Sequence, residues 1–219
     1  MWVVKLGGSL IGSGRRDDPF EPCGLGTGDP THTRPLELML PVLVQEGASK
    51  LVIVPGGGAF ADAVRDAQAR WRFDDLTAHN MAVLAMIQNA HLLCGLHAGL
   101  RRCDREADLP WALQAGQVAV WAPHELLRDK ADDTTTWDHT SDSIALDLAG
   151  RMNAQGLLIV KSCGVDAQAS LSELGAAGVI DRQLATQAST LADVGVDIQV
   201  CGPALPDQFI ARLRAAATN

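Results

Sequence analysis

Short apolar runs recur along the chain and predict the strands of a sheet. Four runs are rich in Val, Ile and Leu: WVVKL (2–6), LVIVP (51–55), VAVWA (118–122) and LLIVK (157–161). IQVCG (198–202) is a fifth run of the same kind. Near-continuous apolar runs of this length are typical of strands that are buried on both faces in a parallel sheet.

Longer segments with helical character alternate with these runs, at 35–46, 59–71, 74–96, 141–152 and 206–217. The alternation predicts an α/β fold with helices on both faces of a mainly parallel sheet. Residues 74–96 are apolar on nearly every face of a helix. We therefore expect this helix to be buried, in part by a second copy of the chain in a dimer or larger homo-oligomer.

One long segment, residues 12–34, has no periodic pattern. It contains five glycines and three prolines. A segment of this kind inside a compact domain is either a mobile lid or a tolerated surface insertion. The sequence leaves both interpretations open, and Arg15 and Arg16 are the reason not to dismiss a lid.

Composition and charge exclude several classes of protein. The net charge of −8 argues against binding to nucleic acid or to an acidic membrane surface, which require a basic face. No apolar run approaches the length of a membrane span, and the first residues do not resemble a secretory signal. The five cysteines are odd in number and form no CxxC pair, which favours a reduced, cytoplasmic protein.

Lysine is rare in this chain, which has 14 arginines but only four lysines. Two of the lysines, Lys5 and Lys161, lie at or near the ends of predicted strands. An ammonium group is a compact point charge, whereas a guanidinium group is a broad planar fork. The bias toward arginine therefore directs attention to these two positions.

The first predicted strand runs from Lys5 into Gly7, Gly8 and Ser9. A strand followed by glycines can direct backbone N–H groups at an anion, because glycine allows close approach. An ordinary tight turn explains this segment equally well.

A second glycine loop, Gly56-Gly57-Gly58, follows the second predicted strand. Three consecutive glycines are entropically costly to order, which indicates that something comes close to this backbone. Residues 56–61 also match the dinucleotide fingerprint G-x-G-x-x-A. That motif requires a second strand that ends in an acidic residue about twenty positions later, but Asp74 and Asp75 begin a predicted helix. The mismatch counts against a dinucleotide-binding site.

Two further segments, WDHTSDS (137–143) and KSCGVD (161–166), complete the set of candidates. Capping of the helix that follows explains Ser141 or Asp142 and is the favoured interpretation; a carboxylate that orients two lysines or takes part in metal binding is the alternative. Ligands of open α/β sheets bind beyond the carboxyl ends of the strands. We therefore expect Lys5, the glycine loops and Lys161 to lie at the same edge.

The histidines and other common motifs do not point to a different chemistry. The six histidines show no HExxH spacing, and neither a GxSxG elbow nor a Walker A sequence is present. These features count against a serine hydrolase and a Walker-type NTPase.

Taken in order, VVKLGGSL, VIVPGGG, TSDSIALDLA and VKSCGVD resemble the amino acid kinase family, which includes aspartate, acetylglutamate and uridylate kinases. The resemblance implies a three-layer αβα sandwich with a mainly parallel central sheet, the carbamate kinase-like fold. It also implies a single domain over 1–219. In that domain, residues 1–125 or so bind the acceptor and residues from about 126 to 219 bind ATP and Mg²⁺.

The resemblance further implies roles for individual residues. Lys5 and Lys161 match positions that contact the transferring phosphoryl group, and Asp142 matches the carboxylate that holds the lysines. The remaining matches are Gly7, Gly8, Ser9, Ser162 and Asp166 on the nucleotide side, and Gly56, Gly57 and Gly58 on the acceptor side. Arg65, close to the second glycine loop, is suited to bidentate contact with an acceptor phosphate. No metal ligand is assigned.

The chain departs from the family pattern after the second lysine, where Cys163 replaces a common threonine and Ala167 a glycine. PGGGAFADAVRD and SDSIALDLA are most similar to the kinases of methanofuran synthesis, which implies [5-(aminomethyl)furan-3-yl]methyl phosphate as the acceptor. A uridylate or carboxylate kinase is the alternative within the family. A non-catalytic storage protein on this scaffold is the alternative outside it.

Overall fold

The computed structural model describes residues 1–12, 35–192 and 195–215, without the side chains of 188–192. Nearly all of the segment predicted to be a lid or an insertion, including Arg15 and Arg16, lies outside the described residues.

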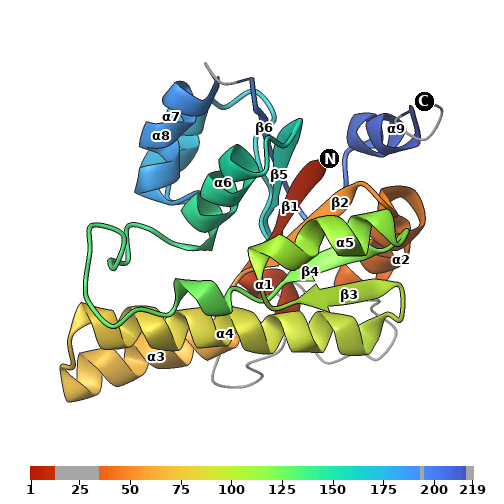
Figure 1. Cartoon of the computed structure of the whole chain (residues 1–219). Helices are drawn as coiled ribbons and strands as arrows, with labels where there is room; N and C mark the ends of the chain where they lie inside the picture. Colours follow the sequence, from red (N-terminus) through yellow and green to blue (C-terminus); the bar gives the residue numbers. More distant parts are fainter. Residues whose placement is uncertain (13–34, 193–194, 216–219) are drawn as a thin grey trace, which may run out of the picture.

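A parallel sheet forms the centre of the fold (Figure 1). Within the described residues its strands are β1 (Trp2–Leu6), β2 (Leu51–Pro55), β3 (Leu100–Cys103), β4 (Val118–Trp121), β5 (Gly156–Val160) and β6 (Asp197–Cys201). Their order across the sheet is β3-β4-β2-β1-β5-β6, and every neighbouring pair is parallel. The five predicted strands are confirmed to within one residue at each end. β3 was not predicted.

The helices of the described ranges cover both faces of the sheet, which confirms the predicted αβα sandwich (Figure 1). They are α1 (Gly8–Ile11), α2 (Pro35–Gly47), α3 (Gly58–Trp71), α4 (Asp75–Leu96), α5 (Leu109–Gln114), α6 (Ser141–Arg151), α7 (Leu171–Ala176), α8 (Arg182–Ala192) and α9 (Asp207–Ala215). Two short 3-10 turns, η1 (Glu106–Asp108) and η2 (His124–Leu126), precede α5 and follow β4. The sequence analysis did not predict α1, α5, α7 and α8, of which α1, α5 and α7 span only four to six residues.

Alternation along the strands decides which side chains reach which helical layer. Val4 and Val160 belong to the core beneath α2, α4 and α9, whereas Val3 and Ile159 belong to the core beneath α5, α6 and α8. Successive strand residues point to opposite faces. Lys5 therefore points to the α6 side, and Lys161, two residues after Ile159, is directed to the same side.

The helical connections on the two sides of strand β1 lie on opposite faces of the sheet. α2 connects β1 to β2 on one face, and α6 connects β4 to β5 on the other. β1 lies between β2 and β5, so its carboxyl end is where the two connections diverge. Open α/β sheets bind their ligands at such a point.

Helix α4 begins with a side-chain cap, because Asp74 accepts a hydrogen bond from the backbone N–H of Thr77 at 2.8 Å. Within one chain, only part of α4 is buried: Leu84 and Leu96 are 46% and 55% exposed. Burial of these side chains by a second copy stays a prediction. None of the helices in the described ranges is both long and apolar enough to cross a membrane.

Candidate active site

A buried carboxylate between two lysines lies at the carboxyl end of the central strands. Lys5 Nζ, from β1, is 2.7 Å from Asp142 Oδ1, and Lys161 Nζ, just after β5, is 2.5 Å from Asp142 Oδ2. The side chains of Lys5, Asp142 and Lys161 are 5%, 3% and 15% exposed. The structure therefore brings together the three residues that were predicted to handle a phosphoryl group. Their catalytic roles stay a prediction.

Two positive charges and one negative charge give this cluster a net positive charge in a poorly solvated place. Burial alone would raise the pKa of Asp142, but the ammonium groups of Lys5 and Lys161 outweigh it and lower the pKa to about 2. Burial, followed by repulsion from Lys5, lowers the pKa of Lys161 against the attraction of Asp142. The cluster provides the local positive charge that an anion requires in a chain with a net charge of −8.

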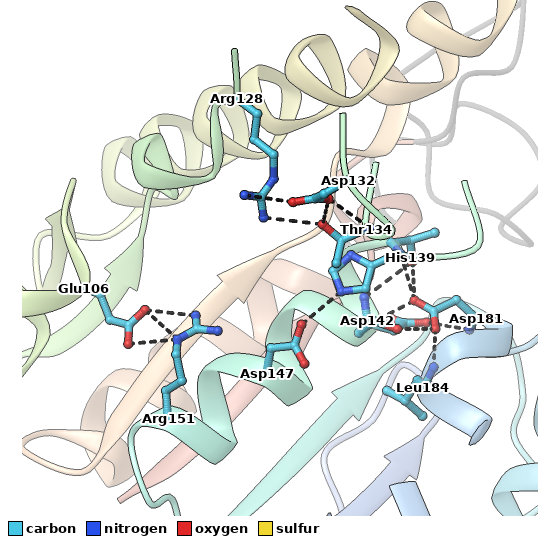
Figure 2. A network of polar contacts seen from close by, with 12 residues as sticks. Glu106, Arg128, Asp132, Thr134, His139, Asp142, Asp147, Arg151, Asp181 and Leu184 are labelled. Atoms are coloured by element: carbon cyan, nitrogen blue, oxygen red, sulfur yellow. Dashed lines mark hydrogen bonds and ion pairs between the residues drawn. The ribbon is translucent and has the colours of Figure 1, made fainter. Parts of the chain in front are cut away.

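A second carboxylate, Asp181, holds the start of α6 in place (Figure 2). Its Oδ2 accepts hydrogen bonds from the backbone N–H and hydroxyl of Thr140 and from the backbone N–H of Ser143, at 2.8–3.0 Å. Its Oδ1 accepts from the Ser143 hydroxyl at 2.6 Å and from the backbone N–H of Leu184 in α8 at 2.7 Å. The backbone N–H of Asp181 also donates to Asp142 Oδ2 at 3.3 Å.

Sequence reasoning missed Asp181, although its position immediately before α8 is a recognisable capping signal. The predicted cap of α6 was also misplaced by one or two residues. Thr140 is the N-cap residue, and its side chain accepts from the backbone N–H of Asp142. Asp142 lies in the first turn, where its side chain is free to reach the lysines.

His139 fixes the segment that leads into α6. Its Nε2 is 2.9 Å from Asp147 Oδ2, and its side chain is 5% exposed (Figure 2). Since Asp147 lies on α6, the pair joins the incoming loop to the helix it precedes.

The two glycine loops pack against each other, backbone to backbone. A Cβ atom added to Gly8 would lie 2.2 Å from the backbone nitrogen of Gly58, and Gly58 has a left-handed φ of +53°. The close approach that the sequence predicted for these glycines is therefore contact between the two loops themselves. Only glycine fits at both positions.

In both loops the N–H of the first glycine is engaged, whereas that of the glycine that begins the following helix is not part of the sheet. The N–H of Gly7 donates to the carbonyl of Val160 and that of Gly56 to the carbonyl of Leu6, both at 2.8 Å, so both extend the pairing of the sheet. Gly8 and Gly58 begin α1 and α3, and first-turn N–H groups have no intrahelical partner. These are the better candidates for anion contact.

Asn89, in α4, supports the second glycine loop, and its only signal in the sequence is a polar residue within an apolar helix. Its side-chain amide donates to the carbonyl of Gly56 at 2.6 Å, and the residue is 2% exposed. The bond connects α4 directly to the loop.

Two hollows lie on this part of the molecule, and Asp142 and Lys161 border the second of them. The first, the α3–α4 cavity, measures about 190 Å³ and is bordered by Gly8, Ser9, Gly57, Gly58 and Arg65 together with an apolar wall from α3, α4 and α6. The second, the α7–α8 cleft, measures about 640 Å³ and is bordered by Asp142, Lys161, Asp181 and residues of α7 and α8. Trp137 and Thr140 line both hollows.

None of the residues predicted to bind the nucleotide lines the α7–α8 cleft: Gly8 and Ser9 line the α3–α4 cavity instead, and Gly7 lines neither hollow. Gly57, Gly58 and Arg65 line the α3–α4 cavity, with Gly56 directly before them. Ser162 and Asp166 follow Lys161 but do not line the α7–α8 cleft. Asp166 is exposed and accepts a hydrogen bond from the backbone N–H of Gln168 at 2.9 Å. Their predicted contact with nucleotide stays a prediction.

Solved structures with the same fold include uridylate (UMP) kinases and an isopentenyl phosphate kinase. The UMP kinase from Bacillus anthracis is 15% identical, with a TM-score of 0.64 over 98% of this chain and 91% of that one. The uridylate kinase from Archaeoglobus fulgidus is also 15% identical, with a TM-score of 0.64 over 97% and 95%. An isopentenyl phosphate kinase is 17% identical, with a TM-score of 0.57 over 98% and 96%.

Comparison of sequences identifies a curated relative and a family. The [5-(aminomethyl)furan-3-yl]methyl phosphate kinase of Methanocaldococcus jannaschii is 26% identical over 161 residues. The match covers 73% of this chain but only 64% of the length of that relative. The family model described as amino acid kinase family matches residues 1–164, which include Lys5, Asp142, Lys161 and both glycine loops. The chain therefore belongs to the amino acid kinase family.

Proposed function

We propose that this chain is an ATP-dependent phosphotransferase whose acceptor is a small molecule that already carries a phosphate. The observation that carries the proposal is the buried Lys5–Asp142–Lys161 cluster, of which Asp142 and Lys161 border the larger of two hollows. The larger α7–α8 cleft suits the nucleotide, and the smaller α3–α4 cavity suits the acceptor. Membership of the amino acid kinase family supports the proposed phosphotransferase activity.

The proposed reaction needs little covalent chemistry from the protein. An oxygen of the acceptor phosphate forms a bond to the γ-phosphorus of ATP, the bond from that phosphorus to the β,γ-bridging oxygen breaks, and ADP leaves. Lys5 and Lys161 offset the negative charge on the transferring group, and such positioned charge provides most of the catalysis in phosphoryl transfer. The acceptor phosphate is ionised near neutral pH, so its attacking oxygen has no proton to lose.

Asp142 is suited to orient the lysines but not to act as a base. Its pKa of about 2 keeps it ionised and a poor proton acceptor. Both of its oxygens face lysine Nζ atoms at 2.5 and 2.7 Å. It therefore fixes the two ammonium groups at the position where the phosphoryl group passes.

Magnesium is expected to arrive with the nucleotide. Asp142 is engaged by two lysines and Asp181 by five hydrogen-bond donors. Among the described residues, no group of three or more His, Cys, Asp or Glu side chains is arranged to hold a metal ion. Mg²⁺ readily keeps several waters and binds through substrate phosphates, where it neutralises charge.

The acceptor is proposed to be [5-(aminomethyl)furan-3-yl]methyl phosphate, which would be converted to its diphosphate. This choice of acceptor is supported by the similarity to the Methanocaldococcus relative, whose name specifies this compound. The α3–α4 cavity, at about 190 Å³, is smaller than the 300–1,000 Å³ typical of ligand pockets, so it favours a compact acceptor over a nucleoside monophosphate. Its wall of Ala, Val, Met and Ile side chains suits a ring.

The test is an ADP-release assay with ATP-Mg and three acceptors: the aminomethylfuran phosphate, UMP and aspartate. We expect turnover with the first compound. Lys5→Met or Lys161→Met should lower it at least about a hundredfold, as is typical when one electrostatic contact to a transition state is lost. Lys130→Met, which alters an exposed lysine outside both hollows, is the matched control.

Three outcomes would change the proposal. Undiminished turnover in both lysine variants would refute the mechanism. Preference for UMP or aspartate would replace the acceptor with that of a uridylate or carboxylate kinase. Tight binding of ATP-Mg without turnover of any acceptor would favour a storage protein.

A further inference from the structure

We propose that Trp137 is a positioning residue that presents Arg65 to the acceptor and links acceptor binding to the segment carrying Asp142. This inference rests on the proposed function. Trp137 is half-buried, lies between η2 and α6, and lines both the α3–α4 cavity and the α7–α8 cleft. It is therefore part of the wall between the two proposed substrates.

The first contact is with Arg65. The guanidinium carbon of Arg65 lies 3.8 Å from the centroid of the Trp137 ring, well inside the range of a cation–π interaction. Arg65 makes no ion pair with the residues that the structure describes, although Asp62 lies one helical turn before it. Stacking uses the face of the guanidinium and leaves its N–H edges for bidentate contact with a phosphate.

A second set of contacts fixes the tryptophan ring. Its Nε1–H donates to Gln68 Oε1 at 2.7 Å, and Gln68 Nε2 donates to Asp75 Oδ1 at 2.8 Å. Because both ends of the Gln68 amide are engaged, the amide cannot turn over without losing both bonds. The ring is thus held by α3 directly and by α4 through Gln68, while Arg65 is stacked on it.

The link to the reaction centre follows from the chain itself. His139 and Thr140, shortly after Trp137, are held by Asp147 and Asp181, and Asp142 follows in the first turn of α6. One short segment therefore carries the residue that orients Arg65 and the carboxylate that orients the lysines. An arginine fixed in advance loses less freedom when the acceptor binds, which strengthens binding.

The inference predicts that Arg65 and Trp137 act as a unit, and a double-mutant cycle measures this. Acceptor KM, ATP KM and kcat are measured with [5-(aminomethyl)furan-3-yl]methyl phosphate for Arg65→Ala, Trp137→Leu and the double variant. We expect each single change to raise acceptor KM about tenfold, and the double change to raise it by little more than about tenfold. ATP KM should stay within about twofold.

The same helix offers a matched control. Arg70 stacks over Trp71 at 5.3 Å, Trp71 is 71% exposed, and neither residue lines a hollow. Arg70→Ala, Trp71→Leu and their double variant should leave acceptor KM unchanged. Thermal unfolding confirms that each variant is folded. If Trp137→Leu does not fold, Trp137→Phe and Gln68→Met replace it in cycles with Arg65→Ala.

Failure of this inference is distinguishable from failure of the proposed function. If the wild type neither binds nor phosphorylates the compound, the proposed acceptor fails and this inference fails with it. If the wild type is active but the two changes multiply to about a hundredfold, the residues act independently and only this inference fails. A change in ATP KM alone would likewise overturn it, because Trp137 would then serve the nucleotide.

Discussion

Replacing Asp142 with asparagine removes a charge from the cluster while nearly preserving its shape. Lys5 and Lys161, at 5% and 15% side-chain exposure, would then face each other without a counter-charge. Breaking a buried ion pair by removing one partner typically costs about 3–5 kcal/mol. We therefore expect a large loss in the free energy of unfolding and loss of turnover.

An independent estimate gives a similar magnitude. A lysine can avoid being buried with a charge by losing its proton. For a lysine with the ordinary pKa of 10.5, deprotonation at about pH 7.5 costs about 4 kcal/mol. The pKa of Lys161 is already lowered, so its own cost is smaller. We expect a loss of about 3 kcal/mol, or about 6–12 °C in Tm for a chain of this length.

Urea unfolding and the ADP-release assay measure the two effects separately. The double variant Lys5→Met/Asp142→Asn should regain part of the lost stability, because one uncompensated charge is gone, but should not regain turnover. Asp133→Asn, at an exposed position, is the control and should change neither. A double variant less stable than Asp142→Asn would refute the electrostatic argument.

The pH dependence provides a further check. The folded-state pKa of Asp142 is depressed to about 2, so its stabilising contribution is present above the unfolded value near pH 4. That contribution is lost as the pH falls from about 4 toward 2. The stability difference between the wild type and Asp142→Asn should shrink over the same interval.

Two substitutions and one pH profile test further parts of the site. Asp181→Asn should lower kcat at least about tenfold with little change in acceptor KM, because it loosens the start of α6; a stability loss with kcat unchanged would contradict this. Gly8→Ala should cost about 1–3 kcal/mol in urea unfolding, because its Cβ would lie 2.2 Å from the Gly58 nitrogen, whereas Gly164→Ala, with nothing within 4 Å, should cost little. The lowered pKa of Lys161 in the unliganded protein predicts that kcat/KM falls at alkaline pH with a midpoint below 10.5, and a midpoint at or above that value would argue against a role for this ammonium group.

The central part of the fold could be predicted from the sequence because it is built from strongly patterned segments. Apolar runs located β1, β2, β4, β5 and β6 to within a residue at each end. β3 was not predicted because its sequence, LRRC, places two arginines in a four-residue strand in which only the two end residues are buried. Edge strands contact a neighbour on one side only and need less apolar sequence.

The candidate site was predictable where a residue follows a strand. Lys5 and Lys161 lie at the ends of apolar runs, so the topology of a parallel sheet brings them to one edge. Asp181 and Trp137 lie in irregular segments without periodicity. Their partners, Ser143 and Gln68, are 38 and 69 positions away in the sequence, and no local pattern reports such a contact.

The contact between the glycine loops also restricts how this protein can change over evolution. When two side chains meet in a core, enlargement of one can be compensated by a smaller residue at the other. Gly8 and Gly58 meet through their backbones, and neither can be replaced by anything smaller. No substitution at Gly58 could make room for a Cβ atom at Gly8. We therefore expect sequence changes in the two loops to occur at the neighbouring positions and not at these two glycines.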